Sequence, residues 1–115
     1  MMIDWKAYKQ ELGKMVGEIG AVSPDIVAGY KALSKAGDNT GHLDRKTREL
    51  IALAVAVTRQ CDGCITVHLD EAVKAGAKKE EIVEALGVAI NVNAGAALVY
   101  SSRAMDALLS KTPQA

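Results

Sequence analysis

Two cysteines and a histidine in the middle of the chain are the residue types best suited to chemistry. Cys61 and Cys64 enclose Asp62 and Gly63, and His68 follows Cys64 by four residues. Cysteines at this spacing can close a small disulfide ring. A helix that begins at the pair presents unpaired N–H groups, which favour a thiolate over a thiol. The motif therefore predicts redox chemistry at sulfur, although structural metal sites use the same spacing.

His68 indicates which cysteine reacts. It lies one turn after Cys64 on the expected helix, so the two side chains share a face. The imidazole can then take the thiol proton or stabilise the thiolate. Cys61 lies at the helix start, seven residues from His68. This spacing favours Cys64 as the attacking cysteine and Cys61 as the one that resolves the oxidised product to a disulfide. The alternative is a histidine satisfied by a local carbonyl, beside two inert cysteines.

Glu49 is the third candidate. The residues three, four, seven and eight positions after it are all Ala, Leu or Val. Its carboxylate therefore lies on a core face, where burial without a partner is costly. If the helices before and after residues 59–61 form a hairpin, Glu49 can reach His68 and hold its imidazole in one tautomer. Pairing with Arg45, with Lys46 or with a partner subunit agrees equally well with the residues alone.

Helical periodicity runs through most of the chain and must position these side chains. Glycines mark expected helix ends, while Ser23-Pro24 and Asp44 are expected helix starts. The pattern predicts about six helices, over residues 5–20, 24–36, 46–59, from the turn at 61–64 to 76, 79–90 and 96–109, with a loop at 37–41 and a break at 91–95. The fold class predicted is all-α.

Length and charge limit the possible partners. The 115 residues carry 14 basic and 14 acidic side chains, which fits one domain over 1–115 with no net charge. A neutral chain without a basic cluster lacks the electrostatic footprint for nucleic acid or an anionic membrane. The apolar stretch 82–100 is about as long as a membrane span, but it contains Glu84, Asn91 and Asn93. We interpret it as a helix buried against neighbours or subunits.

Cysteine usage and core composition indicate the compartment and the assembly state. No secretory signal precedes the two cysteines, so we expect a cytoplasmic protein rather than a disulfide-stapled secreted one. The chain has no Phe, one Trp and three Tyr. Small apolar side chains bury little area each, and a short chain with such a core often gains stability by association. We therefore expect a homo-oligomer.

A family resemblance covers roughly residues 43–100. The stretch from Leu43 to Val55, the segment Cys61-Asp-Gly-Cys64-Ile-Thr-Val-His68, and Ala75-Gly-Ala followed by Glu80-Glu-Ile resemble the alkylhydroperoxidase D-like branch of the carboxymuconolactone decarboxylase family. In this pattern a Glu is followed, after eleven residues, by Cys-x-x-Cys and, after three more, by His. The pattern is specific when it falls on helices. One departure is that the best-studied enzymes of the branch carry a histidine where this chain has Gly63.

The resemblance implies an oligomeric helical fold, as a trimer or hexamer, with peroxidase activity. It implies that Cys64 attacks a small-molecule peroxide, that Cys61 resolves the product, and that His68 and Glu49 relay protons. An external dithiol or disulfide reductant would restore the cysteines, and no cofactor or metal is required. Two alternatives stay open, a general disulfide oxidoreductase and a protein of this fold without peroxidase activity. Zinc held by the same side chains is a further, less favoured possibility.

Overall fold

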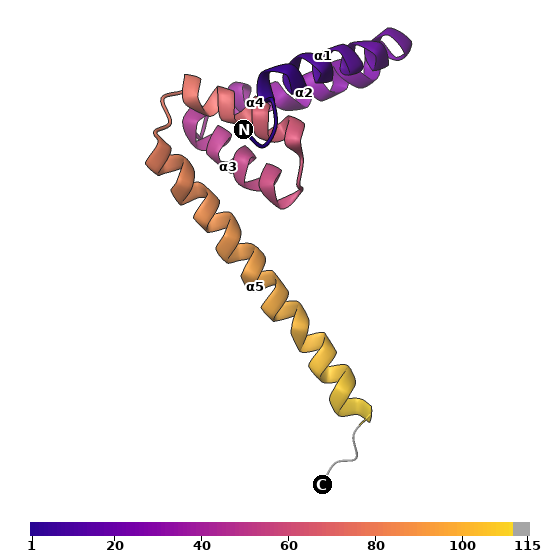
Figure 1. The fold of residues 1–115 in the computed structure, drawn as a ribbon, viewed down its shortest axis with the longest axis vertical. Coiled ribbons are helices and arrows are strands. Elements are labelled where there is room, and N and C mark those ends of the chain that lie inside the picture. Colours follow the sequence, from indigo (N-terminus) through magenta and orange to yellow (C-terminus); the bar gives the residue numbers. More distant parts are fainter. Residues whose placement is uncertain (112–115) are drawn as a thin grey trace.

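The computed structural model describes residues 1–111, and the regular elements in that range are all helices. It contains five α-helices, α1 (Trp5–Val22), α2 (Pro24–Thr40), α3 (Arg45–Thr58), α4 (Asp62–Lys74) and α5 (Lys79–Lys111). Figure 1 shows α1 and α2 side by side, α3 and α4 as a second pair beneath them, and α5 as a long rod leading away. The all-α prediction is confirmed, and the number of helices is one fewer than expected.

The pair α3–α4 forms the centre of the molecule. Asp44 caps α3, because its carboxylate oxygen accepts the N–H of Thr47 at 2.7 Å. The chain then reverses at Gln60, whose φ of 53° is left-handed, and the N–H of Cys61 donates to the Ala56 carbonyl at 3.1 Å. Leu53 and Ala56 of α3 and Ala72 of α4 are buried. The hairpin about residues 59–61, on which the Glu49 hypothesis depended, is therefore present.

The helices α1 and α2 form an N-terminal hairpin whose ends differ from expectation. Pro24 begins α2 as predicted, but α1 runs past Gly20 to Val22, and α2 runs to Thr40. The loop predicted at 37–41 is thus helical except at Gly41. That glycine ends α2 in the left-handed conformation, with φ of 66°, and its N–H donates to the Gly37 carbonyl at 2.8 Å.

Arg48 explains why α2 continues past Gly37. Its guanidinium, which belongs to α3, donates to the carbonyls of Gly37 at 3.1 Å and Leu43 at 2.7 Å, and it pairs with Asp38. A Cβ at position 37 would lie 2.7 Å from Arg48 Cδ. Glycine at 37 therefore allows Arg48 to approach α2. A side chain distant in sequence stabilises the last turn, which local composition cannot reveal.

The helix α5 is continuous through the predicted break at 91–95, so that prediction was wrong. The Asn93 amide donates to the Ala89 carbonyl at 2.7 Å and to the Thr58 hydroxyl of α3 at 2.9 Å. Its polar group is thereby satisfied without leaving the helix. A glycine such as Gly95 costs only about 1 kcal/mol relative to Ala inside a helix. A single 33-residue helix results, and it gives the chain extents of 64 × 38 × 37 Å.

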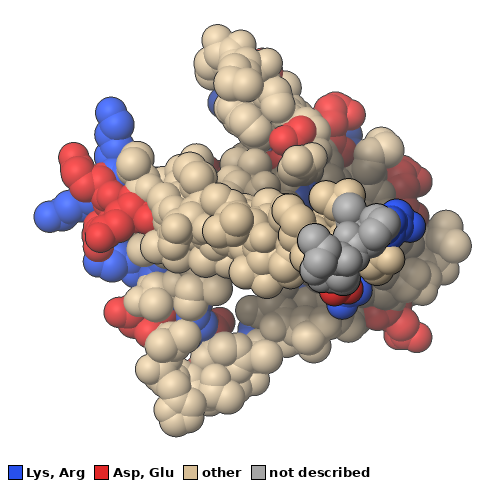
Figure 2. All heavy atoms as spheres, turned by 90° about the horizontal axis from the view of Figure 1, so that it is seen from below, with Lys and Arg blue, Asp and Glu red and all other residues tan. Residues whose placement is uncertain are grey.

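Much apolar surface remains open on the single chain. On α5, Ile90, Leu98 and Val99 are 70%, 77% and 71% exposed, and Ile51 and Val55 leave the outer face of α3 half open. A single chain therefore leaves one face of α3 and much of α5 open to water. Figure 2 looks at the end where α5 finishes, and uncharged side chains cover most of that face while charged ones gather toward its margins.

The same helix meets the length and composition of a membrane span. Its most apolar 18-residue window has a mean hydropathy of 1.7, and 6% of that window is buried. It is the one such helix among the described residues. Core helices of soluble proteins meet the same criterion, so length and composition alone are weak evidence for a membrane.

Candidate active site

Cys61 and Cys64 form a disulfide at the start of α4. Their Cα atoms are 5.3 Å apart. Cys61 is also the N-cap of the helix, because its Sγ accepts the N–H of Cys64 at 3.2 Å. Both sulfurs therefore lie where the unpaired N–H groups and the positive end of the helix dipole converge. This is the environment expected to favour a thiolate when the pair is reduced.

His68 and Glu49 meet across the α3–α4 hairpin. The Nδ1 of His68 lies 2.7 Å from the Oε2 of Glu49, and the two side chains are 27% and 18% exposed. An ionised carboxylate can only accept, so Nδ1 donates its hydrogen and Nε2 is left as the acceptor of a neutral imidazole. The histidine is thereby held in the tautomer that a general base needs.

The other partners considered for Glu49 are engaged elsewhere. Lys46 reaches Glu81 at the start of α5, at 2.7 Å, and Arg45 pairs with Glu71 of α4. The structure thus brings together the four residues predicted for the site. Their catalytic roles stay predictions. The remaining histidine, His42, is exposed between α2 and α3, as expected for a solvated side chain.

Ion pairs and caps around the hairpin fix α3 and α5 relative to each other. The hydrogen bond from Lys46 lowers the pKa of the Glu81 carboxyl, and the N–H of Lys78 acts in the same direction. The same pair raises the pKa of Lys46. At the start of α3, the hydrogen bond from the Thr47 N–H lowers the pKa of Asp44. These groups hold the elements that carry Glu49 and support the site without lining it.

An apolar groove of about 580 Å³ leads to the disulfide. One wall is the start of α4, and the other is the N-terminal hairpin, which supplies most of the apolar side chains. The lining residues are Lys9, Leu12, Gly13, Val16, Ile19, Ile26, Val27, Tyr30, Cys61, Gly63, Cys64, Val67 and His68. The groove lies in the size range of pockets that hold small organic ligands. An electrophile whose body is apolar can therefore reach the sulfurs beside His68.

Leu12 is the neighbour of the motif that sequence reasoning missed. A Cβ at position 63 would lie 2.7 Å from Leu12 Cδ2 and 3.7 Å from Cδ1. Gly63 is buried because the α1 side chain occupies the space beside it. The sequence signal was the glycine itself, in the position where the related enzymes carry histidine. The sequence alone does not show that Leu12 of α1 packs against this glycine.

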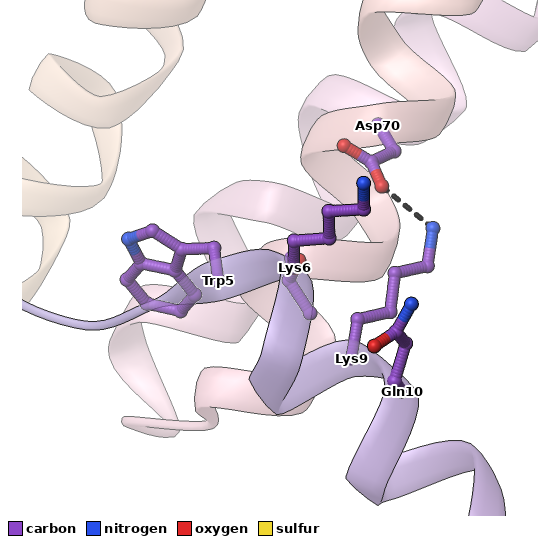
Figure 3. A pocket seen from close by; sticks show the side chains of 6 residues that line it. Trp5, Lys6, Lys9, Gln10 and Asp70 are labelled. Carbon is purple, nitrogen blue, oxygen red and sulfur yellow. Dashed lines mark hydrogen bonds and ion pairs between the residues drawn. The ribbon is translucent and has the colours of Figure 1, made fainter.

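A second hollow of about 550 Å³ opens on the other side of Lys9, and most of the side chains around it carry polar groups (Figure 3). It is lined by Trp5, Lys6, Lys9, Gln10, Thr66 and Asp70. Its charges are largely satisfied internally, because Lys9 pairs with Asp70 at 2.6 Å. Neither cysteine nor His68 lines it, so it contributes to the attachment of α1 to α4 rather than to the dithiol site.

Metal binding has no geometric support in residues 1–111. No three His, Cys, Asp or Glu side chains in that range are placed to hold an ion. The sulfurs that could serve as ligands are joined to each other. The arrangement instead combines a disulfide-bonded sulfur pair, a histidine, and a carboxylate hydrogen-bonded to Nδ1 of that histidine.

Comparison with known proteins shows which proteins this chain is similar to. The chain is 50% identical over 107 residues to an uncharacterized protein of Haemophilus influenzae, covering 93% of this chain and 95% of that one. It is 40% identical over 93 residues to uncharacterized protein 4 in the cox locus of Paracoccus denitrificans, covering 81% and 84%.

A solved structure and a family model agree with these similarities. A carboxymuconolactone decarboxylase family protein from Legionella pneumophila, in its apo form, superposes with a TM-score of 0.72 at 34% identity, covering 92% of this chain and 95% of that one. The model of the carboxymuconolactone decarboxylase family matches residues 24–107, from the start of α2 into α5. The resemblance seen in the sequence is confirmed, and the chain belongs to the carboxymuconolactone decarboxylase family.

Proposed function

We propose that the protein is a thiol-dependent peroxidase of the alkylhydroperoxidase D-like type. The observation that carries the proposal is the hydrogen bond between His68 Nδ1 and Glu49 Oε2, at 2.7 Å, one turn beyond the Cys61–Cys64 disulfide. A structural disulfide needs no oriented imidazole beside it. A peroxidatic cysteine needs a group that takes its proton and returns one to the leaving alkoxide.

The first half of the cycle oxidises the dithiol. His68 takes the thiol proton of Cys64 at Nε2, and the thiolate attacks the outer oxygen of a hydroperoxide. The O–O bond breaks, the sulfur keeps the hydroxyl as a sulfenic acid, and the alkoxide takes the proton back and leaves as an alcohol. Cys61 then attacks that sulfur, so that an S–S bond forms and water leaves. The product is the disulfide state that the structure describes.

The second half restores the thiols. An external dithiol attacks the disulfide through a mixed-disulfide intermediate, supplies two electrons and two protons, and becomes a disulfide itself. No bound cofactor enters either half. A cycle without a cofactor suits a chain of 115 residues. Its dithiol reductant requires a reducing compartment, which we propose to be the cytoplasm.

A general disulfide oxidoreductase is the second candidate, because the open groove beside an oxidised pair suits a thiol substrate as well as a peroxide. Rates separate the two. The reduced protein is mixed with hydrogen peroxide, with an organic hydroperoxide or with a model disulfide, and loss of free thiols is followed. A peroxidase reacts with a peroxide far faster than free cysteine does. Thiols that react quickly with the disulfide alone would favour the second candidate.

Variants test the roles in the same assay. With Cys64→Ser, Cys61 should stay reduced in peroxide, because nothing forms the sulfenic acid. With Cys61→Ser, Cys64 should still be oxidised but should stop at the sulfenic acid, which a dimedone adduct would reveal. Equal reactivity of the two single variants would contradict the assignment of Cys64 as the attacking residue.

We also propose that the protein works as a homo-oligomer, a trimer or hexamer. The apolar faces of α3 and α5 that one chain leaves open support this, because water-exposed patches of that kind usually mark interfaces. The acidic and basic side chains are balanced, so like-charge repulsion between copies is small.

A further inference from the structure

The contact between Leu12 and Gly63 determines what surrounds the reactive sulfurs. Gly63 lies between the two cysteines and is buried, and Leu12 fills the space where its side chain would be. A histidine at 63 would begin with a Cβ 2.7 Å from Leu12 Cδ2, so the leucine in its present position excludes a polar side chain there. The hydrocarbon side chain of Leu12 therefore occupies the space that a hydrogen-bonding side chain at position 63 would need.

Few polar groups remain at the sulfur end of the groove. Apart from the cysteines, the polar side chains among the lining residues are Lys9, Tyr30 and His68. Lys9 is held by Asp70 at 2.6 Å, Tyr30 belongs to α2 on the opposite wall, and His68 is the one of the three on the helix that begins at the disulfide. Beyond Leu12, the same wall continues along α1 with Val16 and Ile19. A ligand with several hydroxyl groups would lose water here without replacing its hydrogen bonds, whereas an apolar body would gain by burial.

We propose that Leu12 is a specificity-determining residue, which makes the dithiol selective for hydroperoxides with an apolar body over hydrogen peroxide. The inference rests on the proposed peroxidase function and deepens it. The hydrocarbon part of the substrate lies against Leu12 and the groove beyond it, so that its outer peroxide oxygen faces Cys64 beside His68. The step itself is unchanged: the hydroxyl passes to sulfur and the alcohol leaves with one proton.

Leu12, which we propose determines selectivity, lies in a different part of the chain from the residues that react. Leu12 belongs to α1, which precedes the residues 24–107 matched by the family model. The dithiol, His68 and Glu49 all lie inside the match. The α1 part of the groove wall and the groups that react therefore lie on different segments of the chain.

The test is a ratio of rates in the full, reduced chain. Second-order rate constants for thiol oxidation are measured with cumene hydroperoxide and with hydrogen peroxide, for wild type, Leu12→Ala and Leu12→Asn. Met15→Ala is the matched control, because Met15 lies on α1 but does not line the groove. Helical content is checked by circular dichroism. A ratio taken within one protein sample is insensitive to any fraction that fails to fold.

Wild type and Met15→Ala should favour cumene hydroperoxide, and both Leu12 variants should lower the preference by roughly tenfold, the scale on which apolar pockets discriminate. The loss should fall mainly on the cumene hydroperoxide rate. An unchanged ratio in both Leu12 variants, or a wild type without preference, would overturn the inference while leaving the peroxidase intact. Thiols that react with neither peroxide faster than free cysteine would overturn the proposed function, and the inference with it.

Discussion

His68 Nδ1 and Glu49 Oε2 lie 2.7 Å apart and join α4 to α3 at the site itself. The pair is partly buried, with the carboxylate the less exposed of the two. One contact therefore has two consequences. It holds Nδ1 of the imidazole that lines the same groove as the two cysteines, and it adds a polar link between the helices of the central hairpin.

Replacing Glu49 by Gln should slow peroxide-driven thiol loss by roughly 10- to 100-fold, within the range that positioned acid–base groups contribute. Glutamine keeps the shape but removes the charge that orients the imidazole. His68→Ala should slow the reaction at least as much. The double variant should be no slower than His68→Ala, because the carboxylate acts only through the histidine. Losses that multiply in the double variant would contradict this dependence.

Gly63→Ala should destabilise the fold by about 1–2 kcal/mol, because Leu12 must give way to the added methyl group. Leu12→Ala alone should also destabilise it, through lost apolar contact. If the two residues compete for one space, the double variant should be more stable than the sum of the single changes predicts. Urea unfolding midpoints measure all four proteins. Strict additivity would show that Leu12 and Gly63 do not share this space in solution.

Leu98→Lys should convert the assembled protein to smaller species, because Leu98 is 77% exposed on α5 and has no role in the single chain. Light scattering should show wild type at a multiple of 12.1 kDa and the variant nearer to one chain. In a monomer the change would be almost silent, within about 0.5 kcal/mol. Ser102→Lys serves as a control for added charge. A wild-type monomer, or one that partitions into lipid vesicles, would contradict the homo-oligomer.

Stability should fall in acid, and Glu81 should contribute to the fall. Its pKa in the folded protein lies below the ordinary 4.5, first because Lys46 donates to it. The unfolded state therefore binds more protons in acid. The contribution of Glu81 is complete above the unfolded pKa and is lost as the pH falls through the folded one. Glu81→Gln should lower stability near pH 7 and flatten its decline between about pH 5 and about pH 3. An equally steep decline would contradict this.

The central hairpin and its chemistry could be predicted because their signals are local. Asp44 caps α3 by accepting the N–H of Thr47, three residues further on, and the positions of Cys64 and His68 on one helical face follow from a four-residue spacing. Glu49 was harder. Its apolar neighbours indicated a partner without naming one, and only the tight reversal at Gln60 decides for His68 over the basic residues of its own helix.

The features that could not be predicted depend on side chains far apart in sequence. Asn93 looks like a helix breaker until Thr58 is placed beside it, and Gly37 looks like a helix end until Arg48 caps it. Leu12 looks like one apolar residue among several on α1 until Gly63 is found against it. In each case the local preference is worth about 1 kcal/mol or less, and a tertiary contact of similar size reverses it.

Cys61 caps α4 with the same sulfur that takes part in the disulfide, accepting the Cys64 N–H at 3.2 Å. Sulfur remains an acceptor as a thiol or thiolate, so the first turn keeps its closing contact when the pair is reduced. In the proposed cycle, oxidant and reductant would thus meet the same helix start, as the two substrates of a ping-pong enzyme do. In the proposed cycle, the start of α4 would therefore need no refolding between the oxidised and the reduced state.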